Sequence, residues 1–592
     1  MFRHAATLII VCAAVVAAQT PATRVPQSPT PGQVPRDTPA QTQPTQMAPT
    51  AKISGRVVAA DTGRPIVRAR VSVSNNQGAG GVVLTGTDGT FQMENLPEGR
   101  FTVQALKSGY ISLQYGQRRP LQSGTPIQLS AGQELKNVDF SLPHGGAISG
   151  RVLDENNDPM PGIPVSVLEY RYMQGARTLS PSGSAQTDDR GEYRVWGLNP
   201  GDYYISATPP QAPAGPGARG QGPAFAGRGA PARGSTNIDT PVLGYAPTYY
   251  PGVASAGDAR PVTLGLSSEV NDVSFSVLLV RTARVTGRVV NADGTPATGT
   301  LNLTSDDPGR RNGPGGRAFG APIAGDGQFS FVNIPPGRYV LRARPGNPNG
   351  RGRGGNVTPM FASTPVLVNG DDVSGISLVL APGASVSGAA TFQVTQSAAP
   401  SNPNQFRVTA PSADFDFAST SPQASIDPKT GAFNIDGLEP GMRILQAQTP
   451  RGWMLKSVTI DGREITDTAF EVKSGQKIAN VALVFTDKIG EMNGTVSDSR
   501  GAPVTEYTVI VFPEDQTFWR PMSRRIVTAR PDQNGKYQIR GLPSGSYYVA
   551  IADPTVQGEW FDPTFLDAQR SGAQRVVLGE GDVKVQDFRL MR

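Results

Sequence analysis

The chain has 592 residues, of which 69 are glycine and 53 are proline, while only 2 are histidine and 1 is cysteine. With 17% charged and 38% hydrophobic residues, it is poor in material for long salt-bridged helices and suited to many short strands between turns. The formal net charge of +6 is small for this length and gives no ground for expecting a nucleic-acid partner.

The first 51 residues are typical of an exported protein. Residues 1–18 have the pattern of a secretory signal peptide, with Arg3 before an apolar run that starts at Ala5 and ends in small residues at Ala18. The run is shorter than the ~20 residues of a membrane-spanning helix. Residues 19–51 are rich in Pro, Gln and Thr, which predicts a disordered, polyproline-like linker. We expect cleavage and a secreted mature chain without a transmembrane segment, either extracellular or at the periplasmic or outer-membrane surface.

One phrase dominates the rest of the chain and occurs five times, in the form Gly-x-aromatic-x-apolar-x-x-Leu/Ile-x-x-Gly. Its first half alternates apolar and polar residues, which indicates a half-buried strand. A turn element such as Pro97-Glu98-Gly99 follows, and then a second apolar alternation. We therefore predict that each phrase forms an antiparallel strand pair with a short loop. The copies start at Gly89, Gly191, Gly327, Gly431 and Gly535.

Two further phrases complete each repeat. An opening such as ISGRVV at Ile53 precedes the central phrase, and a closing strand such as VDFSL at Val138 follows it. About seven short strands in ~100 residues predict a β-sandwich, and hence an all-β tandem array of about five antiparallel β-sandwich domains. The second repeat carries a Gly/Arg/Pro-rich insert at 209–235, and the fourth is divergent, with Arg443 where the others have Phe or Tyr. The expected repeats are 52–143, 147–281, 284–381, 384–486 and 489–592.

These phrases resemble the carboxypeptidase regulatory-like domain. The matching residues are the SGRVV opening, the step from Asp189 to Tyr193 and the turn from Leu542 to Tyr547. The resemblance implies a transthyretin-like β-sandwich, also called a carbohydrate-binding-like fold, without catalytic residues of its own. The whole chain is similar to secreted bacterial multi-repeat proteins of this family.

The residues themselves disfavour catalysis. Zinc peptidases need two or three histidine ligands and a Ser-His-Asp site needs a histidine base, but the expected mature chain has only His144, in a linker between two repeats. Most aspartates precede turn glycines, where local hydrogen bonding explains them. The cluster from Asp154 to Asp158 lacks the distal Glu of a calcium loop and is interpreted as a turn. We predict no enzymatic activity, no catalytic or metal-binding residue and no cofactor.

Arg-Gly segments are typical of RNA-binding tails, but secretion argues against a nucleic-acid partner. They are interpreted as exposed loops, with weak contact to acidic polysaccharide as the functional alternative. They lie near Arg219, Arg228, Arg233, Arg310 and Arg351.

Two aromatic pairs are candidate ligand-contact residues, because they lie in loop-like stretches before closing strands. They are Tyr249 with Tyr250 and Trp560 with Phe561. Their rings could stack on a sugar or pack against the core. The sequence favours a secreted or cell-surface, non-catalytic binding or structural protein, with polysaccharide as the leading partner class. The alternative is an envelope accessory or scaffold protein that contacts other envelope proteins through sheet edges. The oligomeric state stays open.

Overall fold

The computed structural model describes residues 50–590 with internal gaps. The gaps are 76–77, 79, 118–121, 174–175, 210–241, 307–317, 346–358, 396–397, 401, 414–420 and 554–556. The expected signal peptide, nearly all of the proline-rich linker, the insert of repeat two and the Arg-Gly segments therefore lie outside the described residues. The described residues belong to one compact unit, 48–592.

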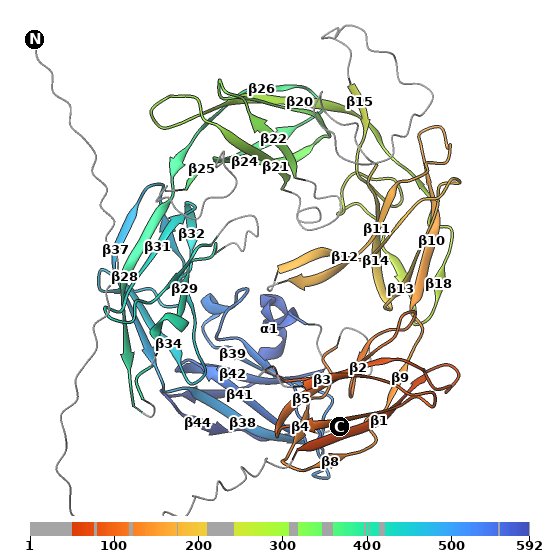
Figure 1. The fold of residues 1–592 in the computed structure, drawn as a ribbon, viewed down its shortest axis with the longest axis vertical. Helices are drawn as coiled ribbons and strands as arrows, with labels where there is room; N and C mark the ends of the chain where they lie inside the picture. Colours follow the sequence, from red (N-terminus) through yellow and green to blue (C-terminus); the bar gives the residue numbers. More distant parts are fainter. Residues whose placement is uncertain are drawn as a thin grey trace, which may run out of the picture. The chain divides into compact units, whose positions relative to one another are not determined.

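The fold is an all-β array of sandwiches, which confirms the predicted fold class (Figure 1). Five large hydrophobic cores follow one another along the chain, each built by one repeat between its sheets. Within the described part there is one α-helix, α1 (Pro563–Arg570), and no helix there combines the length and apolarity that a membrane crossing requires. The domain ranges given above remain predictions.

The elements of the first two repeats are short strands, distributed over two sheets in each repeat except for β15, which joins a sheet of repeat three. In repeat one they are β1 (Ala51–Ala59), β2 (Arg70–Ser74), β3 (Gly80–Leu84), β4 (Thr90–Leu96), β5 (Gly99–Leu106), β6 (Leu113–Gln114), β7 (Ile127–Leu129), β8 (Glu134–Leu135) and β9 (Phe140–Leu142). In repeat two they are β10 (Gly146–Leu153), β11 (Pro164–Met173), β12 (Ala176–Gln186), β13 (Glu192–Leu198), β14 (Gly201–Ala207), β15 (Val242–Tyr245), β16 (Thr248–Tyr249), β17 (Val262–Leu264), β18 (Glu269–Val270) and β19 (Phe275–Ser276).

The later repeats are also built of short strands, which form three sheets in repeat four, and short helical turns are added in repeats four and five. Repeat three has β20 (Leu279–Val290), β21 (Gly299–Ser305), β22 (Phe319–Ile323), β23 (Gln328–Ile334), β24 (Gly337–Pro345), β25 (Met360–Val368), β26 (Val373–Val379) and β27 (Ala381–Pro382). Repeat four has β28 (Ala384–Gln393), η1 (Pro403–Gln405), β29 (Arg407–Thr409), β30 (Gln423–Ser425), β31 (Ala432–Leu438), β32 (Gly441–Arg443), β33 (Gln446–Gln448), β34 (Met454–Ile460), β35 (Arg463–Glu464), β36 (Phe470–Val472) and β37 (Lys477–Thr486). Repeat five has β38 (Gly490–Ser497), β39 (Thr508–Pro513), η2 (Gln516–Phe518), β40 (Val527–Ala529), β41 (Lys536–Leu542), β42 (Gly545–Ala552), η3 (Glu559–Phe561), α1, β43 (Gln574–Leu578), β44 (Val583–Val585) and β45 (Phe588–Arg589).

The predicted pairing of the two strands in each central phrase is wrong. In repeat one, β4 pairs with β1 in one sheet and β5 pairs with β2 in the other. The turn at Pro97-Glu98-Gly99 is therefore a corner that carries the chain from one sheet to the other. Buried residues of both strands face the core between the sheets, so a corner and a hairpin produce the same alternation in sequence. The other four repeats have the same corner.

The closing strand of each repeat lies parallel to the opening strand, so the sheets are not purely antiparallel. This pairing explains the glycine of the opening phrase. A Cβ at Gly494 would lie 1.9 Å from the carbonyl oxygen of Gln586 in the closing segment, which is far inside van der Waals contact. The equivalent distances are 2.1 Å at Gly55, 2.0 Å at Gly150, 2.1 Å at Gly287 and 1.8 Å at Gly388.

In repeats two to five, a side chain on the strand after the corner holds the corner in place. The hydroxyl of Tyr203 donates to the carbonyl of Asn199, four residues earlier, at 2.7 Å. Tyr339 and Tyr547 make the same bond to Pro335 and Pro543, at 2.8 and 2.7 Å. The arrangement is similar to the tyrosine corner of other sandwiches. In repeat four Arg443 takes over this role, because its Nε donates to the carbonyl of Glu439 at 2.9 Å.

We expect Tyr203→Phe to destabilise repeat two by about 0.5–1.5 kcal/mol, because it removes one buried hydrogen bond and leaves a carbonyl without this donor. Hydrogen exchange of repeat-two peptides measures the loss. Repeat one supplies the reciprocal variant, since Phe101 occupies the same position without a hydroxyl, and Phe101→Tyr should strengthen protection there. Unchanged exchange in both variants would show that the corner bond contributes nothing.

Repeats two and three share a sheet. β20 is 12 residues long; its first part pairs with β15 of repeat two and its later part with β23 of repeat three. The hydroxyl of Thr282 also donates to the carbonyl of Val242 at 2.7 Å. A continuous strand leaves no flexible linker at this junction, so the two sandwiches are joined through backbone hydrogen bonds.

Candidate functional site

The first predicted aromatic pair lies in repeat two. Tyr249 is 1% exposed and packs in a small cluster with Leu168 and Leu179. Tyr250 is half-buried against the repeat-two core, with its ring edge-to-face to Phe275 at 6.1 Å. The ring of Tyr249 is thus occupied by packing, and part of Tyr250 reaches solvent.

The second predicted pair lies in repeat five. Trp560 and Phe561 lie in η3, with their ring centroids 6.2 Å apart. Both are half-buried against a cluster that includes Phe512 and Trp519 on β39 and the turn after η2. The two predicted pairs belong to the packing of different repeats, and their role in ligand contact stays a prediction.

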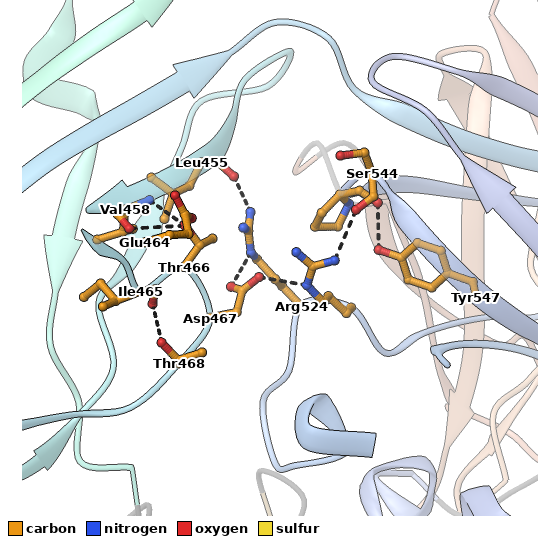
Figure 2. A network of polar contacts seen from close by, with 12 residues as sticks. Leu455, Val458, Glu464, Ile465, Thr466, Asp467, Thr468, Arg524, Ser544 and Tyr547 are labelled. Atoms are coloured by element: carbon orange, nitrogen blue, oxygen red, sulfur yellow. Dashed lines mark hydrogen bonds and ion pairs between the residues drawn. The ribbon is translucent and has the colours of Figure 1, made fainter. Parts of the chain in front are cut away.

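A more polar cluster joins repeats four and five (Figure 2). Asp467 lies in the loop between β35 and β36 and has a positive φ of 57°. The same loop is held by neighbouring hydroxyls: Thr466 accepts from the amide of Val458 at 2.6 Å, and Thr468 donates to the carbonyl of Ile465 at 2.8 Å. These bonds fix the carboxylate of Asp467 toward repeat five.

Two arginines of repeat five donate hydrogen bonds to this carboxylate. Arg524 Nε donates to Asp467 Oδ1 at 2.6 Å, and Arg525 Nε donates to Oδ2 at 3.0 Å. Arg524 also donates to the carbonyl of Leu455 in repeat four, and Arg525 to the carbonyl of Ser544 at 3.2 Å. The side chains of Asp467, Arg524 and Arg525 are only 12%, 27% and 16% exposed, so solvent screens these pairs weakly.

Burial alone would raise the pKa of Asp467, but the guanidinium groups of Arg524 and Arg525 outweigh it and hold the pKa below the ordinary 3.8. Because the folded-state pKa is depressed, the ion pairs contribute their full stability above the unfolded-state value and lose it as pH falls through the folded-state pKa. We expect the stability difference between the native protein and Asp467→Ala to be constant near neutral pH and to shrink below pH 3.8. Urea unfolding of both proteins over this pH range measures the stability difference. If the difference already declines between pH 8 and 6, the Asp467 carboxylate is not the group responsible for it.

A cleft of about 290 Å³ opens beside these residues, lined from both repeats by Trp453, Asp467, Arg520 and Arg524. Burial lowers the pKa of Arg520, and the carboxylate of Asp467 raises it in part. Three arginines face one carboxylate here, so the cluster carries excess positive charge. The cluster therefore holds repeats four and five together, and a small, positively charged cleft lies beside it.

The residues that were weighed as catalytic or calcium-binding groups in the sequence have structural partners. His144 stacks on Tyr110, with centroids 4.2 Å apart, and its Nε2 lies 3.7 Å from Asp61. The carboxylate of Asp154 accepts from the amides of Asn156 and Asp158 at 2.8 Å each, which is the geometry of a turn. Among the described residues no group of three or more His, Cys, Asp or Glu could hold a metal ion.

Sequence reasoning missed one exposed aromatic residue. Trp196 on β13 is 56% exposed and is the one aromatic among the strongly exposed large hydrophobic side chains of the described residues. The signal was present, because Tyr193 and Val195 are the alternating apolar residues of the central phrase, and strand alternation then places Trp196 on the opposite, solvent face.

Comparison with known protein families supports the description of the chain as a series of β-sandwich repeats. Residues 52–143 and 491–591 match the model of the carboxypeptidase regulatory-like domain, so the resemblance is confirmed for the first and last repeats, and the chain is a multi-domain protein that carries this domain. No curated protein matches the chain.

Among solved structures, the chain is similar to the Bacillus anthracis TIE protein, at 10% identity and a TM-score of 0.13 over 93% of this chain and 76% of that one. It is also similar to a streptococcal ancillary pilin, at 12% identity and a TM-score of 0.20 over 56% and 99%. A third is GBS52, the minor pilin of Streptococcus agalactiae, at 14% identity and a TM-score of 0.22 over 40% and 98%. TM-scores this low do not indicate a shared arrangement of domains.

Proposed function

We propose that this chain, with carboxypeptidase regulatory-like domains in its first and last repeats, is a non-catalytic structural and binding protein of the bacterial cell surface. The observation that carries the proposal is the way its repeats are joined. Repeats two and three share β20, and repeats four and five are clamped by Asp467, Arg524 and Arg525. Joints of this kind suit a protein that must hold its modules in fixed positions.

The titratable side chains of the described repeats support a structural role. Tyr193 and Tyr537 donate to the carbonyls of Val273 and Gln586, at 2.7 and 2.6 Å. These are the carbonyls that the opening-phrase glycines approach. Burial raises the pKa of both tyrosines well above 10, so they stay neutral donors at physiological pH. Such groups stabilise strands and are poor proton-transfer catalysts.

Carbohydrate is the ligand class that we propose for the binding role. Aromatic side chains with an apolar ring and a polar group, such as Tyr250 and Trp560, suit partners that are partly hydrated, and Tyr250, Trp560 and Phe561 are each only half-buried. The excess of arginine beside Asp467 favours acidic over basic polysaccharide.

Contact with other envelope proteins through a sheet edge is the second candidate. β3 is the outer strand of its sheet in repeat one and pairs with β2 alone. Val82 and Leu84 on this strand are 54% and 57% exposed. An exposed apolar edge strand is a template for strand addition by a partner.

Fractionation of cells that produce the protein tests the surface assignment. We expect the chain in the envelope or medium fraction, where protease added to intact cells digests it. A chain confined to the cytoplasm and protected from protease would contradict the proposal. Pull-down of the exported protein on cellulose, chitin and acidic polysaccharide then separates the two candidates, because an edge-binding scaffold should bind none of them and should cross-link to envelope proteins instead.

A further inference from the structure

The solvent face of the first sheet in repeat two differs from the same face in two other repeats. In repeat one Glu94 on β4 pairs with Lys52 on β1 at 3.0 Å, and in repeat five Arg540 on β41 pairs with Glu491 on β38 at 3.0 Å. In repeat two the corresponding cross-strand pair is Trp196 and Ala147. An exposed indole beside a methyl group thus replaces a solvated ion pair.

This replacement is not needed by the fold. Repeats one and five build the same strands with charged residues at these positions, and Trp196 points away from the repeat-two core, leaving 56% of the residue in water. An isolated exposed apolar side chain needs no explanation by itself. The paired change at Trp196 and Ala147 does, because it places two apolar residues, a buried alanine and a largely exposed indole, where two other repeats have charged side chains.

Hydrogen-bonding groups surround the indole on the same face. Arg194 Nη2 lies 2.5 Å from Glu269 Oε1, and the hydroxyl of Ser149 donates to Asn271 Oδ1 at 2.6 Å. The first pair spans β10, which lies between β13 and β18, and the second joins β10 to the residue that follows β18. An apolar partner protein would have to strip water from these groups, whereas sugar hydroxyls can exchange hydrogen bonds with them.

We propose that the solvent face of β13, β10 and β18 in repeat two is a carbohydrate-binding surface, on which a pyranose ring of a polysaccharide stacks against Trp196. The C–H groups of the ring lie on the indole, and its hydroxyls contact Arg194, Glu269, Ser149 and Asn271. This deepens the carbohydrate part of the proposed function and rests on it. One ring on one indole gives weak binding per site, which a polymer strengthens by engaging several molecules at once.

The test is binding of the exported full chain to cellulose, chitin and xylan, followed by pull-down and by tryptophan fluorescence. We expect Trp196→Ala to weaken binding about tenfold or more, in line with a buried aromatic contact, and Trp196→Tyr to retain most of it. The double variant Ala147→Lys with Trp196→Glu recreates the ion pair of repeat one, so it should fold normally and fail to bind. Its hydrogen exchange in repeat two confirms the fold.

Trp560→Ala separates this inference from the broader proposal. If binding is lost in Trp560→Ala and kept in Trp196→Ala, the Trp196 surface is wrong and the carbohydrate function stands at the predicted aromatic pair. If no polysaccharide binds the native chain, both carbohydrate statements fail, while the surface-structural role is still judged by fractionation. If Trp196→Ala leaves polysaccharide binding unchanged and alters self-association in sedimentation, the face is a protein contact and the inference is overturned.

Discussion

Gly494→Ala should unfold repeat five locally and cost more than 4 kcal/mol, an effect that single substitutions reach only through a few mechanisms such as strain or overpacking. The new Cβ would lie 1.9 Å from the carbonyl oxygen of Gln586 and 2.9 Å from the ring of Tyr537. Neither atom can retreat cheaply, because the carbonyl belongs to the closing segment beside β38 and the ring is buried. Hydrogen exchange should show lost protection in β38, β41 and β44.

Gly572→Ala in the same repeat is the matched control. A Cβ at Gly572 meets nothing within 4 Å and its φ is not in the left-handed region, so the substitution should change stability by less than about 0.5 kcal/mol, as at most surface sites. Equal protection of repeat five in both variants would contradict the explanation of the opening-phrase glycine.

Asp467→Ala should weaken the contact between repeats four and five by about 3–5 kcal/mol, the range for removing one partner of a buried ion pair. Two guanidinium groups would remain largely buried without their carboxylate. The loss should appear in both repeats, as faster exchange in β36 and in the segment before β40. Exchange confined to one repeat would show that the cluster stabilises a loop and not the junction.

Glu94→Ala supplies the comparison, because Glu94 and Lys52 form an ion pair whose side chains are 47% and 44% exposed. Exposed pairs contribute at most about 1 kcal/mol. A similar loss for Asp467→Ala and Glu94→Ala would mean that burial of the Asp467 cluster adds nothing.

The sequence was informative about strands and uninformative about their partners. The half-buried strand predicted from the alternation in the first half of the central phrase is confirmed at its aromatic position, since Tyr193 and Tyr537 are both buried. The same alternation could not distinguish a hairpin from a corner, nor place the closing strand parallel to the opening one, because pairing is decided by long-range contacts. The SGRVV opening was identified as part of the repeat, but the physical reason for its glycine, the nearby carbonyl of the closing segment, needs the structure.

For the candidate sites too, the sequence indicates local features and does not indicate long-range contacts. The expected loop position led to Tyr249, but the structure places this residue in β16 and buries it in a second, smaller core of repeat two. The Asp467 cluster joins residues more than fifty positions apart in the chain, so no local motif marks it. Trp196 could have been found, because strand alternation alone places it on the solvent face.

The stiffness of the junction between repeats four and five tests the central claim most directly. The one cysteine of the chain is Cys12, in the expected signal peptide, so Lys473→Cys with Arg500→Cys places one spin label on each repeat at exposed positions. Pulsed dipolar spectroscopy should give one narrow distance distribution, which broadens when Asp467→Ala is added. A distribution that is already broad in the parent and unchanged by Asp467→Ala would contradict the account of a surface protein that holds its modules in fixed positions.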